Sequence, residues 1–288
     1  MAGVRLFVSG LSDVGRARET NEDAFEITDL ENGQAIDADR VARYIDVADH
    51  GVLLALSDGM GGRQAGEVAS ALVLESLRTA LSDPEQKSVK DKLEDAVLRA
   101  NRAVLNTAKI AQNHGMAATL TAVLVHGTEA YITEVGDSRA YLLREGRLRQ
   151  ITRDQSLVQL MVDSGAMTPA EAKRSPNRNV VLQAVGLKNE LRVAIARLAL
   201  RAKDRFLLCS DGVTNLVSDG ELRDIMTDSD PRMACETMIA LANERGGDDN
   251  ETAIVADVSG DALAIADEFE SVTSTYEVLQ AYDAMKRR

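Results

Sequence analysis

The sequence contains no tryptophan, only two cysteines and only three histidines. Cys209 and Cys235 can form at most one disulfide and are not at a metal-binding spacing, which predicts two small core residues rather than a disulfide framework. His50, His114 and His126 also lack the spacing of metal ligands. These absences argue against a zinc site and against a cysteine-based enzyme.

Long apolar runs and a basic surface are also missing. No run approaches the roughly 20 residues that a membrane helix requires, and the first segment, MAGVRLFVSG, lacks the features of a signal peptide. The 46 acidic residues outnumber the 33 basic ones, and a net charge of -13 disfavours nucleic acid or an anionic membrane as a partner. The sequence therefore predicts a soluble, cytoplasmic protein, and its acidity alone gives little support for cation binding.

The hydrophobic pattern predicts a framework of strands with helices between them. Helical spacing covers residues 65–81, 87–114 and 230–245. The first two helices follow each other without a strand between them, and a meander of strands follows over residues 118–151, which favours an α+β fold over a doubly wound parallel sheet. The β-type segments are VRLFVSGLS, VLLALSD, ATLTAVLVHG, EAYITEVGDS, RAYLLRE, RFLLCSD and ETAIVADV.

Two further segments have their own patterns. Residues 154–183 predict two short helices and a basic link, which suggests a flap over the core rather than a separate domain. In residues 259–288, apolar side chains recur at alternating steps of three and four, which predicts an amphipathic helical extension. Two interpretations of this C-terminal helix stay open: it packs on the protein's own body, or it contacts a partner or a second copy.

Acidic residues recur in turns at the ends of predicted strands. One Asp-Gly pair is weak evidence, because both residues are common in turns. Several such turns in one domain need a cation or protonation, because clustered carboxylates repel one another. Oxygen ligands with few histidines suit Mg²⁺ or Mn²⁺ rather than Zn²⁺. The residues concerned are Asp58 before Gly59, Asp137 in a tight turn, Asp211 before Gly212, and Asp248 and Asp249 before a strand.

A further charged segment, DVGRARETNEDAF, places Arg18 four residues before Glu22, which Asp23 follows. The planar fork of arginine suits a phosphate group, and the two acids offer oxygen ligands to a cation. Taken alone, the segment also fits the start of a salt-bridged strand.

Together these segments resemble a known family. DVGRARETNED, SDGMGGRQAGEVAS, VGDSRAYL, TRDQSLVQLMVDSGAMT, LLCSDGVTN and GGDDNET are similar, in this order, to the motifs of the bacterial PPM (PP2C-type) metal-dependent serine/threonine protein phosphatases. The resemblance implies a four-layer α-β-β-α sandwich, with two central antiparallel sheets flanked by helices. It also implies a catalytic domain over residues 1–258, with residues 154–183 as a mobile flap, followed by the extension at 259–288.

The resemblance implies two catalytic Mn²⁺ or Mg²⁺ ions and a third, weaker ion. Asp58 is expected to bridge the two ions, Asp137 to hold the third, and Arg18 to bind the substrate phosphate. A water between the ions would attack phosphoserine or phosphothreonine in a protein, without a covalent enzyme intermediate. The implied metal-binding residues are Glu22, Asp23, Asp58, Gly59, Asp137, Asp211 and Asp249.

The expected partners are phosphorylated proteins and the serine/threonine kinase that the enzyme opposes. Met60 stands where eukaryotic relatives carry a histidine that is thought to donate a proton, so a metal-bound water is the hypothesised donor here. Two other functions remain open: a regulatory phosphatase acting on a small partner-switching protein, and a non-catalytic binding module. Intact Asp58, Asp211 and Asp249 argue against the binding module.

Overall fold

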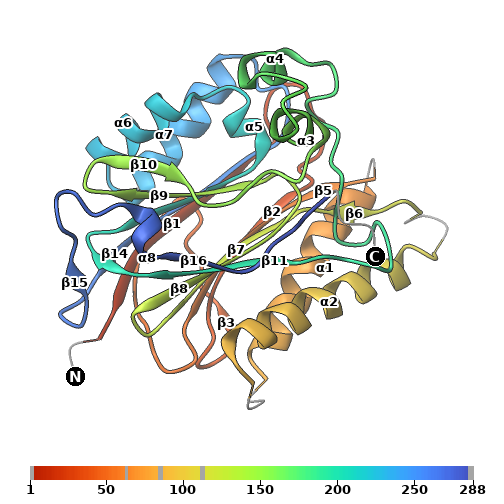
Figure 1. The fold of residues 1–288 in the computed structure, drawn as a ribbon. Coiled ribbons are helices and arrows are strands. Elements are labelled where there is room, and N and C mark those ends of the chain that lie inside the picture. The colour runs from red at the N-terminus through yellow and green to blue at the C-terminus, as the bar shows by residue number, and fades with distance from the viewer. Residues whose placement is uncertain (1–2, 62–63, 84–86, 111–113, 285–288) are drawn as a thin grey trace.

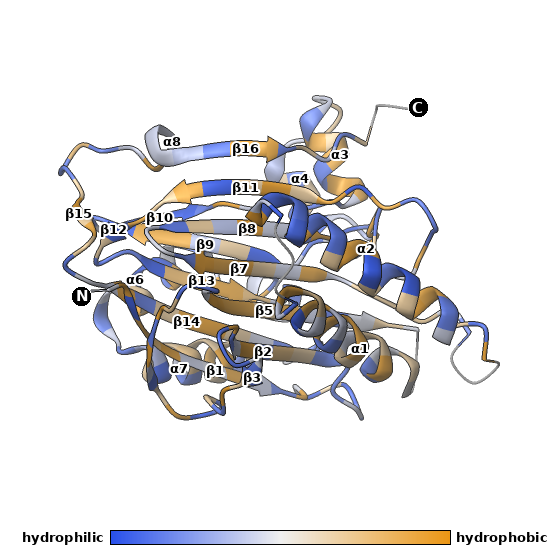
Figure 2. Cartoon of the chain, turned by 90° about the horizontal axis from the view of Figure 1, so that it is seen from below, coloured by the Kyte–Doolittle hydropathy of each residue, from blue (hydrophilic) through white to orange (hydrophobic). Residues whose placement is uncertain are grey.

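The computed structural model describes residues 3–61, 64–83, 87–110 and 114–284. Two antiparallel sheets lie face to face at the centre (Figure 1), and helices cover the outer face of each sheet (Figure 2). The predicted α+β fold, a four-layer α-β-β-α sandwich, is confirmed.

The smaller sheet has six strands, and every pair of neighbours in it is antiparallel. In spatial order its strands are β10 (Arg147–Gln150), β9 (Arg139–Arg144), β13 (Arg205–Cys209), β14 (Glu251–Ser259), β1 (Arg5–Asp13) and β4 (Arg43–Asp46).

The larger sheet has eight strands and is also antiparallel throughout. In spatial order its strands are β16 (Tyr276–Gln280), β11 (Ala194–Ala199), β8 (Glu129–Val135), β7 (Leu120–His126), β5 (Val52–Met60), β2 (Asp23–Asp29) and β3 (Gln34–Ala35), with β6 (Ala117–Ala118) paired to the end of β5. A separate parallel pair joins β12 (Arg201–Ala202) and β15 (Ala264–Ile265).

The long helices divide between the two outer faces (Figure 1). On the larger sheet lie α1 (Gln64–Leu81) and α2 (Val89–Thr107), and on the smaller sheet lie α6 (Asp219–Asp228) and α7 (Pro231–Glu244). The remaining helices are short: α3 (Leu157–Asp163), α4 (Pro169–Arg174), α5 (Asp211–Thr214) and α8 (Val272–Thr275). The predicted helices at 65–81 and 230–245 are confirmed, whereas α2 ends before the predicted residue 114. Among the described residues, none of these helices has the length and apolarity needed to cross a lipid bilayer.

Three apolar clusters fill the spaces between the layers. Between the sheets, Leu54 and Val123 of the larger sheet meet Phe206 and Ile254 of the smaller one. A second cluster joins α1 and α2 to the larger sheet, and a third joins α6 and α7 to the smaller sheet. Because both faces of the central strands are buried, these strands read as continuous apolar runs in the sequence.

Strand β5 shows how this core positions a polar side chain. Leu54 and Leu56 belong to the cluster between the sheets, and the alternate residues Leu53 and Ala55 belong to the cluster under the helices. Side chains along a strand alternate between its faces, so the same period places Asp58 on the side between the two sheets, near the end of the strand.

The C-terminal segment corrects the sequence analysis. The amphipathic helix predicted for residues 259–288 is wrong: Ser259 ends β14, residues 260–284 contain β15, the four-residue α8 and β16, and residues 285–288 lie outside the described part. Strand β16 pairs with β11, with Tyr276 opposite Leu198 and Val278 opposite Ala196. Branched side chains favour strands, and the outer edge of β11 offers backbone partners that an isolated helix cannot use. The segment therefore extends the larger sheet.

The predicted flap, residues 154–183, contains the two short helices that its sequence indicates, α3 and α4. Both begin at a capped residue: Ser156 accepts a hydrogen bond from the Gln159 amide, and Thr168 forms a capping box with Glu171. The bounds of the catalytic domain, residues 1–258, and the mobility of the flap stay predictions.

Candidate active site

The acidic residues predicted from turn motifs come together from both sheets. In the larger sheet, Asp58 near the end of β5 lies directly opposite Asp23 at the start of β2. In the smaller sheet, Asp211 follows β13 and Asp249 precedes β14, its neighbour. Asp137 lies in the turn that carries the chain from β8 in one sheet to β9 in the other. The other four carboxylates all act electrostatically on Asp58, so the five form one acidic cluster.

Threonine hydroxyls fix two members of this cluster. Thr119 Oγ1 accepts a hydrogen bond from the Asp58 amide at 2.9 Å, and the Thr119 amide donates to the Asp58 carbonyl at 2.8 Å. The same hydroxyl lies 2.9 Å from the Ser138 hydroxyl, next to Asp137, and Thr121 donates to the Ser138 carbonyl at 2.7 Å. Thr119 therefore holds the Asp58 backbone and the Asp137 turn in a fixed relation.

The electrostatics of the cluster favour a positive ligand. Burial raises the pKa of Asp58 well above its usual range, and repulsion by the neighbouring carboxylates raises it further. Burial also raises the pKa values of Asp23, Asp137 and Asp211, and repulsion by neighbouring acids adds to it, while hydrogen bonds from Thr252 and Ser210 lower the pKa of Asp23. A divalent cation would relieve this repulsion and hold the carboxylates in their ionised form.

Glu22 adds a buried oxygen atom beside the cluster. Its Oε1 is buried and has no hydrogen-bond partner among the described residues. The Gly59 amide donates to the Glu22 carbonyl at 3.1 Å. A Cβ at Gly59 would lie 2.1 Å from the Gly66 carbonyl oxygen, and a Cβ at Gly66 would lie 2.6 Å from the Glu22 carboxylate. Glycine at both positions is what allows these backbones and Glu22 to approach so closely.

Arg18 stands at the rim of the cluster. Its Nη2 donates to Asp249 Oδ2 at 2.8 Å, while 48% of the side chain remains exposed. Asn250 holds the loop that carries it: Asn250 Nδ2 donates to the carbonyls of Val14 and Thr20, both at 3.0 Å, and its Oδ1 accepts from the Glu22 amide at 2.8 Å. A guanidinium group is thus held beside the acids, where a phosphate oxygen can reach it.

The chemistry of the cluster suits a cation, but its carboxylates are not arranged as a complete set of metal ligands. The side-chain groups that it offers to a metal are all carboxylates, and Glu22 Oε1 has no hydrogen-bond partner among the described residues, which fits Mg²⁺ or Mn²⁺. Within the described ranges, however, no three Asp, Glu, His or Cys side chains are grouped as metal ligands. The metal-binding roles of Glu22, Asp23, Asp58, Gly59, Asp137, Asp211 and Asp249 therefore stay predictions.

Comparison with known families agrees with this geometry. A family model described as "Protein phosphatase 2C" matches residues 28–245. The chain belongs to the protein phosphatase 2C family. The matched span includes three of the five acids of the cluster, Asp58, Asp137 and Asp211, and the predicted family resemblance is confirmed.

The relatives of this PP2C-family chain are bacterial phosphatases. It is 41% identical over 207 residues to the serine/threonine protein phosphatase PstP of Mycobacterium tuberculosis, which covers 72% of this chain but only 40% of the length of PstP. It is 32% identical over 249 residues to the protein phosphatase PhpP of Streptococcus pneumoniae, covering 85% of this chain and 94% of PhpP.

Solved structures give the same result for the fold of this PP2C-family chain. A crystal structure of Mycobacterium tuberculosis PstP superposes with a TM-score of 0.76 at 37% identity, covering 88% of this chain and 99% of that one. The catalytic domain of PstP in complex with two manganese ions gives a TM-score of 0.74 at 36% identity, covering 89% of this chain and 99% of that one.

Two contacts beside the PP2C-family site could not be read from the motifs. One is the clamp made by Asn250: the motif GGDDNET predicts that Asn250 orders the Asp249 turn, but not that it also binds Val14, Thr20 and Glu22. The other is a pair between Arg139 and Asp154, in which Nε and Nη2 donate to the carboxylate at 2.9 and 2.6 Å. This pair joins the entrance of the flap to the strand after Asp137. Both contacts connect distant segments, so spacing along the chain could not reveal them.

Proposed function

We propose that this chain hydrolyses phosphoserine and phosphothreonine in proteins, with two Mn²⁺ or Mg²⁺ ions bound in the acidic cluster. The observation that carries the proposal is the convergence of five buried or half-buried carboxylates from both sheets beside Arg18. The names of the PstP and PhpP relatives, and the two manganese ions in the PstP structure, support the same reaction and the same type of cofactor.

Each residue has a proposed part, which the family resemblance implies. Asp58, on which the other four carboxylates act, would contact both ions, with the Gly59 carbonyl beside it. Asp211 and Asp249 would hold one ion from the smaller sheet, and Glu22 and Asp23 would hold the other, directly or through water. Asp137 would bind a third ion. When bound, the ions would lower the pKa of an attacking water and neutralise charge on the phosphate.

Arg18 would orient the substrate phosphate. Its guanidinium donates to Asp249 through Nη2, and the half-exposed side chain has further N–H groups that can bind phosphate oxygens. Met60, at the end of β5, has no proton to donate, so the leaving serine or threonine would take its proton from water.

The proposed substrates are phosphoproteins made by a serine/threonine kinase, and the proposed compartment is the cytoplasm. Both cysteines are free and buried, which suits a reducing compartment. A regulatory phosphatase that docks a partner-switching protein through a C-terminal helix loses its structural basis, because residues 259–284 form no such helix. We also set aside a non-catalytic binding module, because every predicted acidic ligand is retained.

The test is hydrolysis of p-nitrophenyl phosphate and of a phosphothreonine peptide, with Mn²⁺ and then with excess chelator. We expect activity that chelator abolishes and Mn²⁺ restores. Asp58→Asn and Asp211→Asn should each lower kcat/KM by at least about 100-fold, because each removes charge from the proposed cation site.

Asp228→Asn is the matched control, because Asp228 is exposed at the end of α6 and lies outside the cluster. It should keep the activity of the unaltered chain. Activity that survives chelation, or an Asp58→Asn variant as active as the Asp228→Asn control, would refute the proposal.

A further inference from the structure

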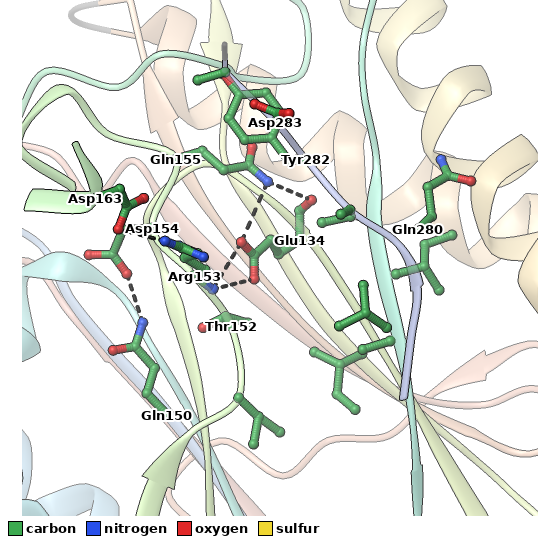
Figure 3. A pocket seen from close by; sticks show the side chains of 18 of the residues that line it. Glu134, Gln150, Thr152, Arg153, Asp154, Gln155, Asp163, Gln280, Tyr282 and Asp283 are labelled. Atoms are coloured by element: carbon green, nitrogen blue, oxygen red, sulfur yellow. Dashed lines mark hydrogen bonds and ion pairs between the residues drawn. The ribbon is translucent and has the colours of Figure 1, made fainter. Parts of the chain in front are cut away.

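A cavity of about 640 Å³ lies beside the flap (Figure 3). Its walls are residues 149–156 and part of α3, strands β8 and β11, and residues of the C-terminal segment between 272 and 284. None of the candidate metal-binding or phosphate-binding residues lines it. Its volume falls in the range of about 300–1,000 Å³ that is typical of small-molecule sites.

Much of the wall is apolar. Ile132 from β8, Leu160 from α3, and Tyr276 and Val278 from β16 all line the cavity. The Tyr276 hydroxyl donates to the Ile151 carbonyl at 2.7 Å, so the ring is left as the apolar part of this side chain. Val278 is 58% exposed, although it is a large apolar residue on a strand. A ligand with an apolar body would gain free energy by covering these side chains.

A buried carboxylate lies in this wall. Glu134 is only 7% exposed, and its two oxygens accept the Arg153 amide at 3.0 and 2.8 Å (Figure 3). Two other lining acids, Asp154 and Asp163, are paired with arginine side chains. Glu134 forms no ion pair with any residue that the structure describes. Gln155 Nε2 also lies 3.5 Å from Glu134 Oε1. A carboxylate has more acceptor positions than these contacts use, and a buried one favours a cationic partner.

We propose that this cavity binds a small ligand that has an apolar body and a protonated amine, with the amine paired to Glu134. The apolar wall would contact the body of the ligand, and the carboxylate would fix its orientation. This chemistry differs from that of the acidic cluster, which is proposed to take metal ions and a phosphate.

Gln155 connects the cavity to the acidic cluster. Its side-chain Nε2 lies 3.3 Å from the Glu134 carbonyl, and its Oε1 accepts the Gly136 amide at 3.0 Å. Its own amide donates to the Gly136 carbonyl at 2.8 Å, and Gly136 immediately precedes Asp137. A ligand that displaces Glu134 or Gln155 would therefore also displace the turn that carries Asp137. The binding of the amine in the cavity is independent of the proposed function, and only the effect of this movement on catalysis rests on it.

Isothermal titration calorimetry with 4-phenylbutylamine tests the site, and 4-phenylbutanol is the neutral probe of the same shape. Burial raises the pKa of Glu134 to about 8, with Asp154 raising it further and Arg153 lowering it, so the titration is done at pH 8.5 with chelator present. The amine should bind about tenfold more tightly than the alcohol, because it adds a charge-assisted hydrogen bond. Glu134→Gln should remove this preference, and Glu75→Gln, an exposed acid on α1, should keep it.

Val278→Trp gives a second test, because the larger side chain should fill part of the cavity and weaken the binding of both probes. This test does not depend on whether Glu134→Gln folds. Equal binding of the amine and the alcohol, no binding of the amine, or binding that is unchanged in Val278→Trp would overturn the proposal. In ¹⁵N-labelled protein, the amine should shift the amide signals of Gly136 and Asp137, and unshifted signals would overturn the link through Gln155. Because no substrate is present, these outcomes are independent of whether the chain is a phosphatase.

Discussion

The ion pair between Arg144 and Asp204 is almost completely buried, with 2% and 0% of the two side chains exposed. Arg144 Nε and Nη2 donate to the two Asp204 oxygens at 2.7 and 2.6 Å. Arg144 Nη1 also donates to Thr275 Oγ1 at 2.7 Å, and Nη2 to the Ala199 carbonyl at 3.1 Å. Arg144 thus joins β9 of the smaller sheet both to the turn before β13, through Asp204, and to α8 of the C-terminal segment, through Thr275.

Asp204→Ala should lower the free energy of unfolding by about 3–5 kcal/mol, because it leaves the guanidinium buried with only neutral partners. The double variant Arg144→Met, Asp204→Leu should recover most of this loss, because neither charge then has to be buried. Urea unfolding followed by far-UV circular dichroism measures both, since the chain has no tryptophan for a fluorescence assay.

The matched control is Glu236→Ala, which breaks the half-exposed pair between Arg232 and Glu236 on α7. Exposed pairs four residues apart contribute about 0.3–0.5 kcal/mol, so this variant should change stability little. If Asp204→Ala costs no more than Glu236→Ala, or if the double variant is less stable than Asp204→Ala, the reasoning from burial is wrong.

Three further predictions concern the site and the cavity. Gly59→Ala should lower activity and folded yield, because its Cβ would lie 2.1 Å from the Gly66 carbonyl oxygen. In Gly220→Ala, the control, the added Cβ meets nothing within 4 Å, so circular dichroism and activity assays should show neither effect. Asn250→Ala should lower kcat/KM by about tenfold or more while the fold survives, because the loop that carries Arg18 loses three hydrogen bonds. An unchanged kcat/KM would contradict the role of Asn250 in holding this loop. Burial raises the pKa of Glu134 from 4.5 to about 8, so between these values the folded state keeps a proton that the unfolded state has lost. Its contribution to stability therefore falls as pH rises through this window, and the stability of Glu134→Gln relative to the unaltered chain should increase from pH 5 to pH 8 in chelator. A difference that stays constant with pH would contradict this assignment.

The sequence predicted the parts of the fold that depend on local patterns. Strand β5 is apolar on both faces, and its run ends at Asp58 as the sequence indicates. The C-terminal segment was predicted wrongly because its apolar residues fit a helical period, while the deciding partner, β11, lies far away in the sequence. No pattern within residues 276–280 shows that the edge of β11 is available.

The site shows the same limit. Motifs located Arg18 and the acidic residues one by one, and three of these acids, Asp58, Asp137 and Asp211, each lie next to a glycine. They did not reveal the clamp of Asn250 on residues 14–22, or the bridge that Thr119 makes between Asp58 and the Asp137 turn. Hydrogen bonds of this kind join residues that only the folded chain brings together.

Strand β16 bears on how the protein can be shortened for experiments. A protein cut after Val258, where the motifs end, would keep every proposed active-site residue but lose β16, the Tyr276 bond to Ile151 and the partner of Arg144 in α8. The backbone groups along β11 would then be free to pair with another chain, which is a common cause of aggregation. An inactive truncated protein would therefore report a damaged sheet edge rather than a missing catalytic group, and assays of catalysis need the chain through residue 284.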